Sequence, residues 1–140
     1  MKTYNFLLLA IAMIFATFAG CGGPKIVSVK GVATAQGKPV PHLIIHFSPV
    51  AGRPSSALTD ENGCFELEFD RKLKGAVVGT HKVTVTVAPR DPTEEEMMAM
   101  GHPPRDPIRA AIAAKFAKQD ATPLSVTITK AEAALDLKFD

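Results

Sequence analysis

Residues 59–69 read TDENGCFELEF and join a tight turn to an alternating strand. The dipeptide Asn62-Gly63 favours a primed hairpin turn, because glycine adopts positive φ at little steric cost. After the turn every second residue is apolar, which is typical of a strand with one buried face. The inward positions are Phe65, Leu67 and Phe69, and the outward positions are Cys64, Glu66 and Glu68. We therefore predict a strand that lies over a core.

The same two-residue period recurs in the rest of the chain and predicts further strands. A first strand covers residues 27–35, in which Gly31 followed by Val32 breaks the alternation and predicts a bulge. Residues 36–39 form a turn after it, and residues 56–59 form a short strand. The other inward faces are Leu43, Ile45 and Phe47, then Val83, Val85 and Val87, then Leu124, Val126 and Ile128, and last Leu135, Leu137 and Phe139.

Residues 89–107 interrupt the strand pattern, because five of these 19 residues are prolines. We expect a Pro-rich loop in which Thr93 caps one helical turn over residues 93–98. The loop is either a plain excursion or an adaptable patch that binds a partner through its flexible methionines. Those methionines are Met97, Met98 and Met100. Beyond the loop, apolar residues recur with helical spacing over 108–116 and predict a short amphipathic helix.

About seven strands with one apolar face each must bury that face, and two facing sheets are the usual solution at this length. We therefore predict an all-β fold, an antiparallel β-sandwich over residues 26–140 with one short helix. All five phenylalanines after the first twenty residues fall on the predicted inner faces. They are Phe47, Phe65, Phe69, Phe116 and Phe139.

The first twenty residues have the form of an export signal. Lys2 gives a positive start, and residues 6–18 are apolar except for Thr17. This run is short for a helix that spans a bilayer and has the right length for the core of a signal peptide.

Residues 18–21, Phe-Ala-Gly-Cys, resemble the lipobox of bacterial lipoproteins. The resemblance implies a signal peptide over residues 1–20, cleavage before Cys21 and a diacylglycerol on the Cys21 thiol. Residues 21–25 would then be the lipidated cysteine and a short tether. An uncleaved anchor, or an ordinary signal peptide with an incidental cysteine, are the alternatives.

A second resemblance covers nearly the whole chain after Cys21. Residues 59–65, TDENGCF, resemble the T-D-x-x-G-x-F turn of carboxypeptidase regulatory-like (transthyretin-like) domains, and residues 31–39 resemble their opening hairpin. Residues 112–116 and 122–126 resemble the segment before the closing strands in small bacterial lipoproteins of that kind. The resemblance implies an Ig-like or transthyretin-like sandwich, and its motifs carry no catalytic residue.

Composition excludes several classes of protein. The 140 residues are enough for one domain, and 16 basic against 14 acidic residues leave a net charge of +2. No basic field is available to attract nucleic acid. The chain has no Trp, and its one Tyr is Tyr4. We therefore do not expect an aromatic platform of the kind that stacks on sugars or bases.

The four histidines are the first candidates for chemistry. His42 and His46 share a strand face but lie roughly 13 Å apart at about 3.3 Å per residue, too far to chelate one ion as a pair. His46 and His81 could meet across neighbouring strands. We expect solvated surface histidines at these positions and at His102, and no metal site.

The remaining candidates are a thiol and a turn. If Cys21 carries lipid, Cys64 has no partner in the chain, and we interpret it as a small strand residue. Asp60 and Asn62 have the spacing of calcium ligands, but the later acidic ligands are missing. We interpret them as a turn held by Asx hydrogen bonds. No catalytic residue and no cofactor are therefore expected.

These patterns favour a non-enzymatic lipoprotein of the cell envelope, exported through the inner membrane and held at a membrane by lipid on Cys21. Its expected role is structural, adhesive or binding, with an envelope protein or polysaccharide as partner and no nucleic acid. The alternative is a periplasmic enzyme or metal carrier that uses His46, His81 or Cys64.

Overall fold

The computed structural model describes residues 22–140, so the predictions for the signal peptide and for Cys21 lie outside the described residues. The described chain is mostly β, as expected, with ten strands and two helices. In order they are β1 (Ile26–Val27), β2 (Val29–Ala35), β3 (Lys38–Pro39), β4 (Leu43–Pro49), β5 (Ser55–Leu58), β6 (Cys64–Glu66), β7 (Ala76–Val77), β8 (Gly79–Val87), α2 (Pro92–Ala99), α3 (Pro107–Phe116), β9 (Ser125–Ile128) and β10 (Glu132–Lys138). Neither described helix is long and apolar enough to cross a membrane.

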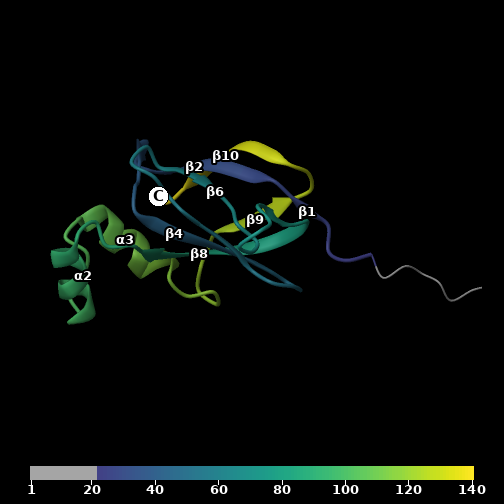
Figure 1. The fold of residues 1–140 in the computed structure, drawn as a ribbon. Helices are drawn as coiled ribbons and strands as arrows, with labels where there is room; N and C mark the ends of the chain where they lie inside the picture. The colour runs from purple at the N-terminus through teal and green to yellow at the C-terminus, as the bar shows by residue number, and fades with distance from the viewer. Residues whose placement is uncertain (1–21) are drawn as a thin grey trace, which may run out of the picture.

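Two four-stranded sheets supply the core (Figure 1). One has the order β10-β2-β3, with β6 also paired to β2, and the other has the order β5-β4-β8-β9. A small third sheet joins β1 to β7. Buried residues of both large sheets form one hydrophobic cluster, for example Ala33 of β2, Ile45 of β4, Val85 of β8 and Leu137 of β10. The core therefore lies between the two sheets.

The predicted alternation is confirmed in the strands that carry the core. Leu43, Ile45 and Phe47 of β4 and Val83 and Val85 of β8 are fully buried. The residues between them along β4 are only partly buried, whereas Thr84 of β8, on the opposite face from Val83 and Val85, is buried as well. Because successive side chains of a strand point to opposite faces, this pattern places one face of each strand on the core.

The direction of β10 contradicts the prediction of a purely antiparallel fold. β10 runs parallel to β2, with Leu137 beside Ala33. The cause is the preceding connection, because β9 belongs to the other sheet and only residues 129–131 separate the two strands. This short link crosses between sheets at the end where β2 begins, and there the Glu132 N–H donates to the Ser28 carbonyl at 2.9 Å. β10 must then run in the same direction as β2.

The bulge predicted at Gly31 is wrong, because the irregularity lies on the neighbouring strand. β2 pairs regularly with β6, and Gly31 opposes Phe65. The register shifts in β10 instead, between Glu132 and Leu135. A Cβ at Gly31 would lie 2.2 Å from the Leu135 carbonyl oxygen and 2.7 Å from the Phe65 ring. Glycine is required there because other groups fill the space, not because β2 bends.

The turn at residues 60–63 joins the two sheets and is not the predicted primed hairpin. Gly63 has the expected positive φ of 71°, but Asn62 does not share it. β5 pairs with β4 and β6 pairs with β2, so the chain leaves one sheet and enters the other here. Asp60 holds the turn, because its Oδ1 accepts hydrogen bonds from the N–H groups of Asn62 and Cys64, both at 2.9 Å.

The segment 89–107 contains a full helix, so the prediction of a single short helix is wrong. α2 is capped by Asp91 rather than Thr93, because the Asp91 Oδ1 accepts from the Glu94 N–H at 2.8 Å. α3 confirms the other predicted helix and packs its apolar side against β8. Figure 1 shows both helices at one end of the sheets, with α2 farther from the strands than α3.

One of the five phenylalanines departs from its predicted place. Phe47, Phe65, Phe116 and Phe139 are buried, whereas Phe69 is only partly buried. β6 ends at Glu66, so the alternation that placed Phe69 inside does not continue that far. The guanidinium of Arg53 lies 5.8 Å from the centre of the Phe69 ring and covers part of it.

Candidate functional site

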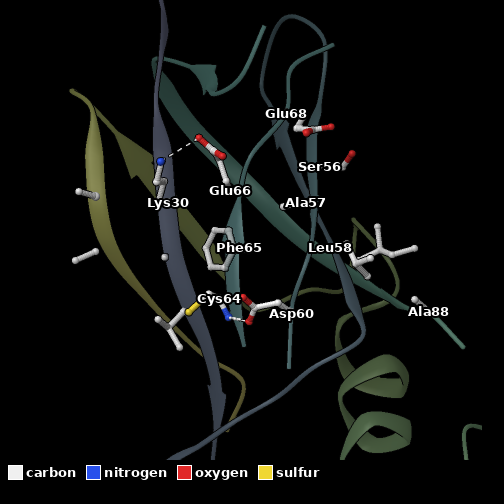
Figure 2. A pocket seen from close by; sticks show the side chains of 15 residues that line it. Lys30, Ser56, Ala57, Leu58, Asp60, Cys64, Phe65, Glu66, Glu68 and Ala88 are labelled. Carbon is white, nitrogen blue, oxygen red and sulfur yellow. Dashed lines mark hydrogen bonds and ion pairs between the residues drawn. The ribbon is translucent and has the colours of Figure 1, made fainter. Parts of the chain in front are cut away.

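A groove of about 880 Å³ lies where β5 and β6 face each other. Figure 2 shows Lys30 and Glu66 on one side of it and Ser56 and Leu58 on the other. These strands are the neighbouring edges of the two large sheets. The groove therefore lies at the seam between the sheets.

Two backbone clips close the seam at either end of the groove. At one end the Ser56 and Glu68 peptide groups exchange hydrogen bonds of 3.1 and 2.8 Å. At the other end the Asp60 N–H donates to the Cys64 carbonyl at 2.9 Å. Peptide groups two residues apart in a strand point to the same side, so Leu58 directs its N–H and carbonyl toward the groove.

Glu66 occupies the matching position on β6, between Cys64 and Glu68, which form the hydrogen bonds across the seam. No backbone hydrogen bond joins Leu58 to Glu66 in the part of the chain that the structure describes. The groove thus presents strand-edge donors and acceptors from both sides, which are groups that a partner's peptide or polar side chain can pair with.

The lining of the groove is largely apolar. Phe65 and Ala57 form its floor, and Phe65 is itself 5% exposed because its ring lies against Gly31. Leu58 is 58% exposed, so it is an apolar side chain that the fold leaves in water. The other apolar lining residues are Val32, Ile44, Ala88, Ala133 and Ala134.

Charged groups stand at the rim. The Glu66 carboxylate forms ion pairs with Lys74 at 2.7 Å and with Lys30 at 3.3 Å. The hydrogen bond from Lys74 and then that from Lys30 lower the pKa of Glu66 below its usual value. Glu68 and Asp60 add two carboxyl groups to the lining. The lysines therefore neutralise only part of the negative charge of the rim.

The structure does not bring the predicted candidate residues together. The prediction of a solvated surface histidine at position 81 is wrong, because His81 lies on the core face of β8 with Val83 and Val85 and is 1% exposed. Its Nε2 donates to the Val77 carbonyl at 2.7 Å, and its ring centre lies 5.7 Å from that of Phe47. His46 is on the opposite face of its sheet, with Nε2 at 3.2 Å from the Thr86 hydroxyl, and partial burial lowers its pKa.

Cys64 is exposed and lines the groove on β6, in the other sheet from both of these histidines. Among residues 22–140 no group of three His, Cys, Asp or Glu side chains is close enough to hold a metal ion. The His42 Nε2 forms a hydrogen bond with the Glu61 carboxylate at 2.8 Å. The carboxylate of Asp60 is engaged in its turn, as the sequence indicated.

A buried ion pair holds the two helices, and sequence reasoning missed it. Arg109 and Glu94 are 0% and 1% exposed, and the Arg109 Nη1 donates to both Glu94 oxygens at 3.1 and 3.2 Å. Its Nη2 donates to the Ala88 carbonyl. Glu94 also accepts from the N–H groups of Arg90 at 2.7 Å and Arg105 at 3.1 Å. We call these five residues the clasp.

The clasp determines the ionisation of its carboxyl group. Burial raises the pKa of Glu94, but the N–H groups of Arg90 and Arg105 and the Arg109 guanidinium outweigh burial and lower that pKa from 4.5 to about 2. A sequence signal for the pair did exist. Arg109 stands three residues before the buried Ile112, on the same helix face, and a charge on a buried face needs a counter-ion.

Comparisons of the chain with protein-family models, with curated proteins and with solved structures found no match. The resemblance to carboxypeptidase regulatory-like domains and to the lipoprotein lipobox therefore stays a prediction.

Proposed function

We propose that this chain is a non-enzymatic, lipid-anchored binding module of the bacterial cell envelope. The sequence supports the lipid anchor, because an apolar run and two small residues directly precede Cys21. We also propose that the domain is an Ig-like, transthyretin-like sandwich. Support comes from two sheets around one core and from the turn in which Asp60 orients the chain toward the buried Phe65.

The observation that carries the binding role is the groove between β5 and β6. It combines exposed apolar side chains with strand-edge peptide groups that have no partner across the seam, and such a surface suits a protein ligand. The aromatic ring in the groove is nearly covered, which makes stacking on a sugar a poor use of it. An envelope protein is therefore favoured over a polysaccharide.

The placement of His46, His81 and Cys64 weighs against the alternative function. A metal carrier or hydrolytic enzyme needs its ligands, or its nucleophile and base, within contact distance of one another. Here one histidine lies inside the core, one lies on an outer face, and the thiol belongs to the other sheet.

A photo-crosslinking amino acid at position 58, in the full chain in intact cells, tests the binding role. We expect one discrete crosslinked envelope protein. In a separate co-purification without the crosslinker, the Leu58→Lys variant should fail to retain this protein. The matched control is Val50→Lys, because Val50 is 93% exposed and is not part of the groove lining. Equal co-purification with both variants, or no discrete crosslink, would contradict a role for the groove.

A further inference from the structure

We propose that the end of α2 is a binding site for Cu(I), with the Met97 and Met100 thioethers and the His102 imidazole as ligands. The sequence MMAMGH over residues 97–102 places three thioethers and an imidazole within six residues. The chain has five methionines, and all three that follow Cys21 are here. The site depends neither on the groove nor on the lipid anchor.

The backbone draws these side chains together at the end of the helix. The His102 N–H donates to the Met97 carbonyl and the Gly101 N–H donates to the Met98 carbonyl, both at 3.0 Å. Gly101 has a φ of +90°. This is a Schellman termination, in which the residue after the glycine folds back onto the residue that accepts its hydrogen bond. His102 is therefore next to Met97.

Helix geometry adds the second thioether. Met97 and Met100 are three residues apart and lie on the same side of the helix end, whereas Met98 is displaced by about 100° of rotation from Met97. Met100 is 65% exposed and has no packing role that would explain an apolar side chain there. Met97, Met100 and His102 therefore occupy neighbouring backbone positions at the end of α2.

The returning chain is fixed as well, which a metal site requires. After His102 two prolines restrict the backbone, and the Arg105 N–H then donates to Glu94 at 3.1 Å. Arg105 also pairs with Asp91 at the start of α2. Segment 102–105 is therefore held along the helix at both ends by the clasp and by the Schellman bonds. Such support limits the entropy lost when the ligands order around an ion.

The donor set identifies the class of ion. Thioether sulfur is a soft ligand that selects Cu(I), and imidazole suits copper equally well. Ca²⁺ and Mg²⁺ prefer oxygen ligands, and Zn²⁺ in proteins is held by thiolate, imidazole and carboxylate rather than by thioether. Two thioethers with one imidazole therefore favour Cu(I) over these divalent ions.

The test uses the full chain in detergent with Cys64→Ser, which removes an exposed thiol that would compete for Cu(I). Titration against a chromogenic Cu(I) chelator should give one ion per chain. Met97→Leu, Met100→Leu and His102→Ala should each weaken binding by more than about tenfold. Met98→Leu is the matched control and should not weaken it. Leucine keeps the volume and helix propensity of methionine, so the helix should persist in these variants.

A second measurement identifies the ligands directly. With methyl-labelled methionine, Ag(I), a soft ion that does not change oxidation state, should shift the methyl NMR signals of Met97 and Met100 and leave that of Met98 in place. Zn²⁺ should shift none of them. A wild-type chain that binds no Cu(I), equal effects of the three leucine variants, or a response to Zn²⁺ as strong as that to Ag(I) would each overturn the proposal.

Discussion

At position 63 both the backbone conformation and the surrounding space require glycine. Gly63 has a φ of +71°, and a Cβ there would lie 2.7 Å from the Ala33 carbonyl oxygen. Gly37 has a similar φ of +74° but open space around it. Substitutions at Gly37 and Gly63 therefore separate the free-energy cost of a positive φ from the cost of a steric clash with the added Cβ.

We expect Gly37→Ala to lower the free energy of unfolding by about 1–2 kcal/mol, because a left-handed conformation is unfavourable for any residue with a Cβ. Gly63→Ala should cost clearly more, because the carbonyl that it meets is fixed in β2. Urea unfolding of both variants measures the difference. Equal losses would show that the chain near Ala33 yields to the extra methyl group.

The neighbouring residues 65 and 66 test which face of β6 lies on the core. Phe65→Ala removes a buried ring that fills the space above Gly31 and should lower the free energy of unfolding by about 3–5 kcal/mol. Glu66→Ala removes only solvent-accessible ion pairs, so it should change the free energy of unfolding far less than Phe65→Ala does. Similar losses in a denaturant titration would mean that the strand is turned the other way.

At the scale of elements, the clasp couples two helices that the rest of the fold contacts unequally. α3 packs on β8, whereas α2 is held through Glu94. The Glu94 carboxylate accepts hydrogen bonds from the Arg109 guanidinium and from two backbone N–H groups. Removing one partner of such a pair leaves an uncompensated buried charge, which typically costs about 3–5 kcal/mol. The position of α2, and with it the end of that helix, depends on this pair.

The ionisation of Glu94 predicts a dependence of stability on pH. Its pKa is about 2 in the folded chain, below the usual 4.5, so the unfolded chain binds more protons between these values. The stabilisation is complete above about pH 5 and decreases as the pH falls toward 2. Glu94→Gln should remove this component, on the order of 3 kcal/mol at neutral pH.

Free energies of unfolding at pH 7 and pH 3 check this prediction. The loss between these pH values should be smaller in Glu94→Gln than in the wild type. Glu95→Gln, on the exposed side of the same helix, should keep the wild-type loss. A Glu94→Gln variant with an unchanged loss would place the acid sensitivity elsewhere.

At the scale of the whole molecule, attachment to a membrane should depend on Cys21 alone. The net charge of the chain is only +2, so electrostatic attraction to a membrane surface is weak. Two or three acyl chains hold a protein stably, because each buried CH₂ contributes about 0.8 kcal/mol. The wild type should partition into detergent, and Cys21→Ser should block lipidation and the lipoprotein-type cleavage.

Fractionation of residues 22–140 fused to an ordinary cleavable signal peptide completes this test. We expect that product in the soluble periplasmic fraction. If it still pellets with membranes, the domain has its own affinity for a membrane or a membrane protein, and the tether does not explain the attachment. Crosslinking at position 58 that persists in the same soluble product would show that the groove binds its partner without the anchor.

The sequence by itself determined the features that depend on local periodicity. Alternation identified the core faces of β4 and β8, helical spacing identified α3, and a glycine before Cys64 identified a position with positive φ. These are properties of residues two to four apart, and burial of an apolar face is nearly enough to fix them.

Only the tertiary structure decided how distant segments meet. It made β10 parallel to β2, turned the expected hairpin at residues 60–63 into a crossing between sheets, and joined Glu94 to Arg109. It also opened the groove where β5 and β6 part between their two clips. The physical reason is that a two-residue period specifies which face of a strand is buried, but it carries no information on the neighbouring strand or on the partner of a buried charge.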